Sequence, residues 1–253
     1  MKKTIFLSFL LLFIASPIIN AITFKKYSGE RLFYLPNMSN EMEANVYELH
    51  QYDIEFPIDG SNALKKAILD YTFDYKGSSI SSATEEFLSN YIGFDNSEQP
   101  QLASKTTGED SWVQESKVWG KLMFQSTNLI AYEAGGFTYF AGATHGLEGV
   151  AYLNFYTPTQ KVLSLYDVLL KSKESTILSR LRKQARIVAR NKQCFNAPNE
   201  ILISENFYIT KKGITFVYQP YEIACYADGI IKITIPKSQL TGCLTALGKK
   251  LFK

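Results

Sequence analysis

The stretch from Gly135 to Tyr156, GGFTYFAGATHGLEGVAYLNFY, limits the possible folds of this chain more than any other part of it. It combines five glycines with many aromatic residues and one of the two histidines. Aromatic side chains such as Tyr139 suit a half-buried strand. Gly142 and Gly146 permit positive φ or a close approach of the backbone to a neighbour. The stretch therefore predicts a strand, a turn and a second strand.

The second strand, Val150 to Tyr156, has a period of two. Its alternation predicts one face formed by Tyr152, Asn154 and Tyr156, and an opposite face formed by Ala151, Leu153 and Phe155. The segment Thr157–Gln160 follows with proline at the second position of a turn, where its fixed φ fits. Lys161–Leu165 is then expected to return as a further strand.

The first 21 residues are typical of a secretory signal peptide. Lys2 and Lys3 form a positive start, Ile5–Ile14 is apolar, and Ala21 is a small residue suited to cleavage. The apolar run is short for a membrane span, although an uncleaved anchor is the alternative. We expect a periplasmic or secreted protein with no stable membrane span after signal cleavage.

The charge of the chain excludes one class of partner. Loss of Lys2 and Lys3 with the signal peptide would lower the net charge from +3 to +1. A chain so close to neutral offers no electrostatic reason to bind nucleic acid. The hydrophobic fraction of 46% is enough for a sizeable core.

The three cysteines are Cys194, Cys225 and Cys243. Export would bring all of them into an oxidising compartment, and an odd count allows at most one internal disulfide. We favour Cys194 with Cys225, because that pair would join a loop after a helix to a strand. The alternative is three buried thiols.

Residues 22–110 are predicted to form an N-terminal strand–helix–helix sub-domain. Ser61 is a candidate N-cap for the first helix, and Ser82–Glu85 fits a capping box for the second, which Gly93 would end. The remaining elements expected here are strands over Ile22–Tyr34 and Val46–Pro57, a loop over Pro36–Glu43 and a surface loop over Asp95–Asp110.

Residues 111–253 are predicted to form the second sub-domain. The expected elements are a hairpin of Ser111–Gln125 and Asn128–Ala134, a helix over Lys173–Asn191, strands over Phe207–Thr210 and Ile214–Tyr218, a tight hairpin turn at Ala227–Gly229 and a strand over Ile230–Ile235. The order of elements predicts an α+β fold in which helices pack on a mostly antiparallel sheet. The arginine-rich face of the long helix is either a solvated surface or a docking face for an acidic partner.

No pattern of catalytic, metal-binding or cofactor-binding residues stands out. His50 and His145 are far apart in sequence, and no cluster has zinc-ligand spacing. A Gly-x-Ser-x-Gly elbow, a phosphate-binding glycine loop and a dinucleotide fingerprint are all absent from the sequence. A carboxylate pair of the glycosidase type is conceivable, but nothing marks one. We therefore expect a protein that is not an enzyme and uses no metal or cofactor.

The candidate binding residues are Tyr139, His145, Tyr221 and Tyr226. His145 either contacts a ligand from an exposed loop or holds its turn through hydrogen bonds to backbone. Tyr221 and Tyr226, with Tyr218, either form an aromatic patch for a protein or a glycan or serve only in packing.

Several motifs resemble those of a known family. They are Ala141-Gly142-Ala143-Thr144-His145-Gly146, Asn154, the turn after Tyr156, Leu165–Leu170, Gly213-Ile214-Thr215-Phe216, Pro220-Tyr221-Glu222-Ile223-Ala224 and Tyr226-Ala227-Asp228-Gly229. The chain resembles the extracytoplasmic domain of unknown function in the lysozyme-sensing anti-sigma-V factor, which also forms a non-catalytic part of a peptidoglycan deacetylase. Val46–Gly93 is similar to the smaller domain that precedes it. Cys225 departs from the pattern, because that position is commonly proline.

The resemblance implies an exported, non-enzymatic binding module of the bacterial cell envelope. Its expected partner is a lysozyme-like protein or cell-wall glycan, bound through the loop around His145 and the nearby tyrosines. The alternatives are an accessory envelope hydrolase or deacetylase with a carboxylate-based site, and a structural protein with no small ligand.

Overall fold

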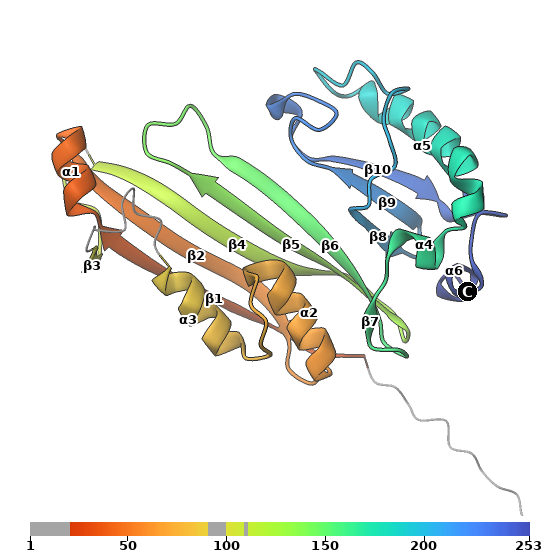
Figure 1. Cartoon of the computed structure of the whole chain (residues 1–253), viewed down its shortest axis with the longest axis horizontal. Coiled ribbons are helices and arrows are strands. Elements are labelled where there is room, and N and C mark those ends of the chain that lie inside the picture. Colours follow the sequence, from red (N-terminus) through yellow and green to blue (C-terminus); the bar gives the residue numbers. More distant parts are fainter. Residues whose placement is uncertain (1–20, 91–99, 109–110) are drawn as a thin grey trace, which may run out of the picture.

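A computed structural model of the chain describes residues 21–90, 100–108 and 111–253 (Figure 1). The predicted signal peptide therefore lies, except for Ala21, outside the described residues. The predicted helix end at Gly93 and part of the predicted loop Asp95–Asp110 also lie outside them. Within the described ranges, no helix is both long and apolar enough to cross a membrane.

Most of the described strands belong to one long, seven-stranded sheet with the order β3-β1-β2-β4-β5-β6-β7. Every neighbouring pair in it is antiparallel except β2 with β4, which is parallel. The predicted α+β class with a mostly antiparallel sheet is confirmed. The strands are β1 (Phe24–Tyr34), β2 (Asn45–Pro57), β3 (Gln101–Ala103), β4 (Ser111–Gln125), β5 (Leu129–Tyr139), β6 (Leu147–Tyr156) and β7 (Lys161–Val162).

The sheet joins the two predicted sub-domains, since β2 from residues 22–110 pairs with β4 from residues 111–253. The predicted β4–β5 hairpin forms around residues 126–128. The predicted alternation of β6 is also present. Leu153 and Phe155 pack with the helices on one face, while Asn154 on the other face bonds to the backbone of Phe207 and Ile209.

Two helices, α2 (Asn62–Phe73) and α3 (Ile80–Ser89), cover one face of the sheet (Figure 1). Ser61 caps α2 as predicted, accepting a hydrogen bond from the backbone N–H of Leu64. The predicted start of α3 at Ser82 is wrong by three residues. Ser79 is the N-cap and its hydroxyl accepts from Ser82 N–H, so Ser82 already lies inside the helix. The core beneath the helices includes Ile54, Phe56, Leu64, Ile68, Tyr132, Leu153 and Phe155.

Two short elements stand where loops are predicted. Residues Pro36–Met42 form helix α1, which starts with proline at its first turn and buries Met38 beside Leu35. Gln101–Ala103 forms β3, because its residues pair with the end of β1. Both elements depend on contacts with β1 and β2 rather than on a local periodic pattern.

The C-terminal lobe, residues 165–253, is built on a second sheet with the order β10-β9-β8. Its elements are α4 (Leu165–Val168), η1 (Lys171–Lys173), α5 (Glu174–Ala189), β8 (Phe207–Thr210), β9 (Gly213–Tyr218), η2 (Tyr226–Asp228), β10 (Ile231–Pro236), η3 (Lys237–Gln239) and α6 (Ala246–Leu251). Helix α5 packs on β10 through Ile177, Leu181 and Ala185, on the side of the small sheet that faces away from the large one (Figure 1).

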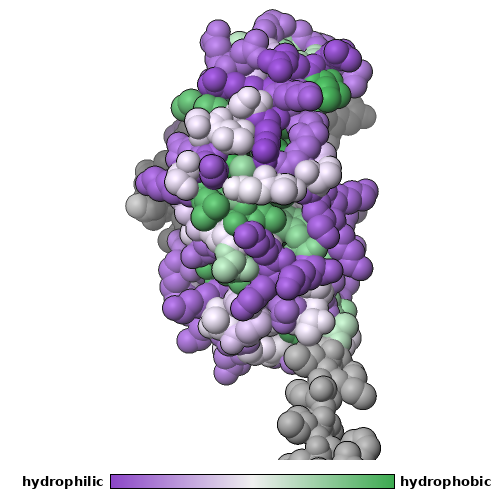
Figure 2. Space-filling model, turned by 90° about the vertical axis from the view of Figure 1, so that its right-hand side faces the viewer, coloured by the Kyte–Doolittle hydropathy of each residue, from purple (hydrophilic) through white to green (hydrophobic). Residues whose placement is uncertain are grey.

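The arginine-rich face of α5 is used within the chain. Arg180 donates to the carbonyls of Gln239 and Thr241, and Arg182 donates to the carbonyl of Ile201. Figure 2, which faces the side formed by the C-terminal lobe, shows a mostly hydrophilic surface with hydrophobic residues near its middle. The hydrogen bonds of Arg180 and Arg182 to backbone carbonyls give these two arginines a structural role at the surface of α5.

The predicted tight hairpin turn at Ala227–Gly229 is wrong. Strands β9 and β10 do pair, with Tyr218 opposite Ile231, but residues 219–230 form a long loop between them. The segment Ala227–Gly229 closes this loop through the 3-10 helix η2, with Gly229 at φ 64°. A disulfide and a buried carboxylate, described below, hold the loop in this longer form.

Candidate functional site

The site lies where two segments distant in sequence meet. One is the turn between β5 and β6, residues 140–146, and the other is the loop between β9 and β10, residues 219–230. In the turn, Gly142 has φ 83°. A Cβ at Gly146 would come within 2.3 Å of the Phe137 ring, so only glycine lets the chain pass there. The two glycines therefore play the two roles expected of them.

His145, Tyr221 and Tyr226 come together at this junction, and we name them the histidine–tyrosine surface. The rings of His145 and Tyr226 stack with their centroids 4.0 Å apart. The Tyr221 hydroxyl lies 3.1 Å from Nε2 of His145, whose Nδ1 lies 2.9 Å from the carbonyl oxygen of Gly146. An Nδ1–H that donates to this carbonyl leaves Nε2 to accept from Tyr221. His145 thus holds its turn and orients a neighbouring tyrosine at the same time.

Tyr221 combines exposure with an uncommon backbone conformation. Tyr221 is 60% exposed, and its backbone φ is +68°. A bulky residue rarely adopts this left-handed region, at a cost of about 1–3 kcal/mol. Residues with such backbone strain persist only where the surrounding structure holds them in place, and they are frequent at functional sites.

The other tyrosines predicted as binding or packing residues lie elsewhere. Tyr139 ends β5 opposite Glu115 and is not among the rings that contact His145 in the described part of the chain. Tyr218 is buried in β9 and donates its hydroxyl hydrogen to the carbonyl of Leu202, as expected of a packing residue. The structure therefore gathers three of the four predicted binding residues.

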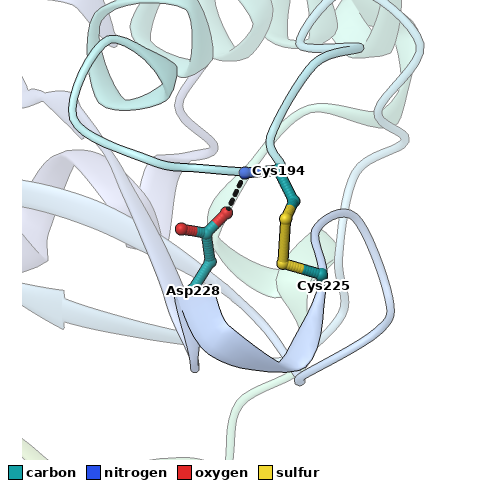
Figure 3. Close-up of side chains that lie close together, drawn as sticks. All are labelled: Cys194, Cys225 and Asp228. Atoms are coloured by element: carbon teal, nitrogen blue, oxygen red, sulfur yellow. Dashed lines mark hydrogen bonds between the residues drawn. A yellow bond between two sulfur atoms is a disulfide. The ribbon is translucent and has the colours of Figure 1, made fainter.

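A disulfide fixes the loop that carries Tyr221 and Tyr226. Cys194 and Cys225 are bonded, with their Cα atoms 5.5 Å apart (Figure 3). Cys243 is a buried free thiol. The favoured pairing is confirmed, although Cys225 lies in the loop before η2 rather than in a strand. Cys194, Cys225 and Asp228 also lie close enough for a metal site, but the bonded sulfurs are not thiolate ligands.

Asp228 is a second contact, beside the disulfide, that holds the 219–230 loop in place. Its buried carboxylate accepts a hydrogen bond from the backbone N–H of Cys194 at 2.8 Å (Figure 3). It accepts another from the backbone N–H of Gln193 at 2.7 Å. Burial by itself raises the pKa of this carboxyl. The two backbone N–H donors and nearby Lys192 outweigh burial, so the pKa of Asp228 lies below its ordinary value of 3.8.

The lowered pKa of Asp228 predicts a pH dependence of stability. Its contribution is fully present above the pKa of the unfolded chain and is lost as the pH falls through the lower, folded-state pKa. Asp228→Asn should lower the melting temperature at neutral pH, because one of the two N–H donors would then face an amide NH₂ group. Thermal melts from neutral pH down to about pH 2 should show the difference between wild type and variant shrinking below about pH 4. A difference that is constant with pH would contradict this role.

Side-chain amides close the edge of β6 next to the histidine–tyrosine surface. Gln219 bonds to both the N–H and the carbonyl of Val150, while Asn206 bonds to the carbonyl of Val150 and the N–H of Tyr152. The two amides bond the backbone groups of β6 that would otherwise be left unpaired at the exposed edge of the sheet. They also fix the lobe against the large sheet and thereby set the position of the 219–230 loop.

A second polar contact between lobe and sheet centres on Glu133. Its carboxylate accepts from the Tyr152 hydroxyl, from Trp119 Nε1 at 3.3 Å and from Lys232 Nζ at 3.1 Å. Burial raises the pKa of Glu133, but Tyr152 and Lys232 outweigh it and leave the pKa lowered. Sequence reasoning missed this group. The only available signal was a glutamate within the apolar strand Leu129–Ala134.

Two exposed carboxylates lie on the segments that form the histidine–tyrosine surface, and Lys192 donates to the backbone carbonyl of the nearby Asp228. Residues 140–149 and 219–229 contain Glu148, Glu222 and Asp228 but no lysine or arginine. Glu148 and Glu222 are exposed, while Asp228 is buried. A shallow groove of about 470 Å³ runs beside the surface, between Tyr221 and Tyr71 of α2. The site therefore offers exposed aromatic rings, a groove and two exposed carboxylates.

Comparisons with known proteins agree with this architecture. Residues 169–238 match the family described as "Protein of unknown function (DUF3298)". A solved DUF3298 family protein from Pseudomonas aeruginosa PAO1 is similar with a TM-score of 0.63 and 19% identity, over 92% of this chain and 98% of that chain. A solved DUF3298 member from Bacteroides fragilis is similar with a TM-score of 0.70 and 18% identity, over 91% and 97%. No curated protein gave a significant match.

At these identities the solved structures show a common fold and nothing of a ligand. The resemblance to the anti-sigma-V factor and the deacetylase remains a prediction. The matched residues span α5 and strands β8 to β10, together with the loop that bears Tyr221 and Tyr226. Residues 169–238 of this chain therefore match the DUF3298 family model, within a fold similar over most of its length to two solved DUF3298 proteins.

Proposed function

We propose that the protein is an exported binding module of the bacterial cell envelope, without catalytic activity, that binds a basic protein of the lysozyme type through the histidine–tyrosine surface. The observation that carries the proposal is Tyr221. It is exposed and strained, yet the hydrogen bond to His145 and the disulfide next to its loop hold it in place.

Exposed, rigid tyrosines are suited to protein recognition. Tyrosine is enriched among the few residues that dominate binding energies at protein interfaces. A ring already fixed by the free protein loses little conformational entropy on binding. Tyr221 meets both conditions, because its hydroxyl and backbone are fixed before any partner arrives.

The charge of the surface favours a basic partner. Glu148 and Glu222 are exposed on its two segments, which lack lysine and arginine. Complementary charge accelerates association and weakens with salt. A protein is favoured over cell-wall glycan at this surface, because the groove beside it is shallow and the aromatic rings are presented outward.

The test is binding of the mature chain, residues 22–253, to immobilised lysozyme and to insoluble peptidoglycan, each at low and at high salt. We expect saturable binding to lysozyme that weakens at high salt. Tyr221→Ala should weaken it by about tenfold or more, the effect of a central interface tyrosine. His145→Ala should weaken it less, since it removes the support of Tyr221 rather than the contact itself.

Ile187→Ala is the matched control, because Ile187 is also exposed but lies on α5. It should bind lysozyme like the wild type. Equal affinity of wild type and Tyr221→Ala would contradict the proposal. So would sedimentation with peptidoglycan that is lost in Tyr221→Ala, because it would assign a glycan to this surface.

The absence of catalysis is tested in the same preparation. The mature chain is incubated with peptidoglycan, and the supernatant is assayed for soluble saccharides, peptides and acetate. We expect none above the level of a heat-inactivated sample. Release that disappears when a single carboxylate is replaced, without unfolding, would instead show an enzyme.

A further inference from the structure

The face of the large sheet opposite α2 and α3 carries a second groove, of about 600 Å³. It lies over strands β1, β2, β4, β5 and β6, next to the region where the C-terminal lobe packs on the same face through Tyr152 and Tyr208. None of the residues that line it belongs to the histidine–tyrosine surface. Glu148 lines both this groove and the shallow one near Tyr221, so the two sites are neighbours.

Trp119 of β4 is the aromatic platform of this groove. Its indole lies over Gly135 of the neighbouring strand, where a Cβ would come within 2.0 Å of the ring. The indole Nε1 donates to Glu133, which fixes the direction of the ring. Trp119 is half-buried, lines the groove and also packs against the cluster of Val150, Tyr152 and Val217. The glycine thus makes room for a tryptophan that is held before any ligand binds.

The polar side chains around Trp119 carry both signs of charge. Lys117 and Lys121 flank it along β4, and Asp53 is its register partner on β2. Lys26 pairs with Asp53 at 2.8 Å. Glu115, Glu55 and Glu148 supply further carboxylates, of which Glu55 accepts a hydrogen bond from the backbone N–H of Leu122. In total three lysines and four carboxylates line the groove, so its net charge is small.

The near balance of lysines and carboxylates favours a neutral ligand over a strongly charged one. A polyanion would meet four carboxylates, and a polycation would meet three ammonium groups. A neutral ligand rich in hydroxyl groups can donate to the carboxylates and accept from the lysines. A sugar ring also presents an apolar face of C–H groups that can lie on the indole.

We propose that the groove around Trp119 binds a neutral oligosaccharide, at a site separate from the histidine–tyrosine surface. Trp119 supports a ring, while Lys117 and Glu148 bond to hydroxyl or amide groups on either side of it. The length of the groove across five strands, spaced about 4.8 Å apart, suits an extended chain of several sugar units.

The experiment uses the Trp112→Phe variant, in which Trp119 is the only tryptophan, since the chain contains two. The probe is a soluble hexamer of N-acetylglucosamine, with maltohexaose as a second neutral sugar and polyphosphate as an anion. We expect a saturable change of tryptophan fluorescence with at least one neutral sugar and none with polyphosphate. A response to polyphosphate alone, or no response to either sugar, would overturn the proposal.

Calorimetry then assigns the contact. Trp119→Ala should weaken sugar binding by about tenfold, the effect of losing one aromatic contact. Because Trp119 also packs near the lobe, the exposed variants Lys117→Ala and Glu148→Gln provide a second measure, each with an expected loss of about threefold. Unchanged binding in all three variants would overturn the assignment, and so would cleavage of the hexamer by the wild type.

Glu148 borders both sites, so the two proposals are separated by Tyr221 and Trp119, each of which belongs to one site. Tyr221→Ala should leave sugar binding unchanged, and Trp119→Ala should leave lysozyme binding within twofold of the wild type if the lobe stays in place. Loss of sugar binding in Tyr221→Ala would place the glycan at the histidine–tyrosine surface and would contradict the separate site.

Discussion

Replacement of both Cys194 and Cys225 by serine is expected to lower the free energy of unfolding by about 3–4 kcal/mol. The disulfide closes a loop with a sequence separation of 31 residues, and its loss frees this loop in the unfolded chain. The same change releases the segment that carries Tyr221 and Tyr226. We therefore also expect weaker binding of lysozyme at temperatures where the variant is still folded.

Urea denaturation with and without a reductant measures the first effect. The reductant should shift the midpoint of the wild type to lower urea concentration and leave the double variant unchanged. This control also accounts for Cys243, which is present in both proteins. A double variant as stable as the oxidised wild type would show that the disulfide does not support the fold.

His50→Ala is expected to cost about 1–3 kcal/mol of stability, because it removes the buried imidazole that bonds to the Glu48 carboxylate and leaves Gln114 as the side chain that donates to it. His50 and Glu48 are each only 1% exposed, and Nε2 of His50 lies 2.5 Å from Oε1 of Glu48. The other nitrogen, Nδ1, lies 3.0 Å from the carbonyl oxygen of Phe87, near the end of α3. The pair therefore ties this helix to β2.

The double variant Glu48→Leu/His50→Leu is the matched comparison. Apolar side chains of similar volume are expected to recover part of the loss, because no buried carboxylate remains, although the buried Gln114 amide loses Glu48 as its acceptor. Denaturation of the single and double variants by urea distinguishes the cases. If His50→Ala lost less than about 1 kcal/mol, the pair would not hold the helix as described.

Local patterns predicted the elements whose formation depends mainly on their own residues. The alternation of β6, the cap at Ser61 and the long helix α5 are examples. Helix α1 and strand β3 were missed because they exist through contacts with β1 and β2. The turn at Ala227–Gly229 was misjudged because the disulfide and Asp228, rather than the local turn sequence, shape that loop.

In the candidate site too, the sequence indicated individual residues but not the contacts between distant segments. His145, Tyr221 and Tyr226 could be singled out because glycines, proline and cysteine surround them in the sequence. Their contact across 76 residues of sequence follows from how the lobe packs on β6, which no local pattern contains. Tyr139 belongs to the same glycine- and aromatic-rich stretch as His145, but it ends β5 opposite Glu115 and is not part of the histidine–tyrosine surface. The sequence does not indicate the groove around Trp119, because the glycine beneath the indole comes from another strand.

Hydrogen–deuterium exchange of the mature chain, alone and with saturating lysozyme, locates the surface that the partner covers. We expect slower exchange on binding in residues 140–149 and 219–229, with no comparable change in α5. The same protection should be lost in Tyr221→Ala. Protection confined to other parts of the chain, or none at all, would contradict a lysozyme-type partner at the histidine–tyrosine surface.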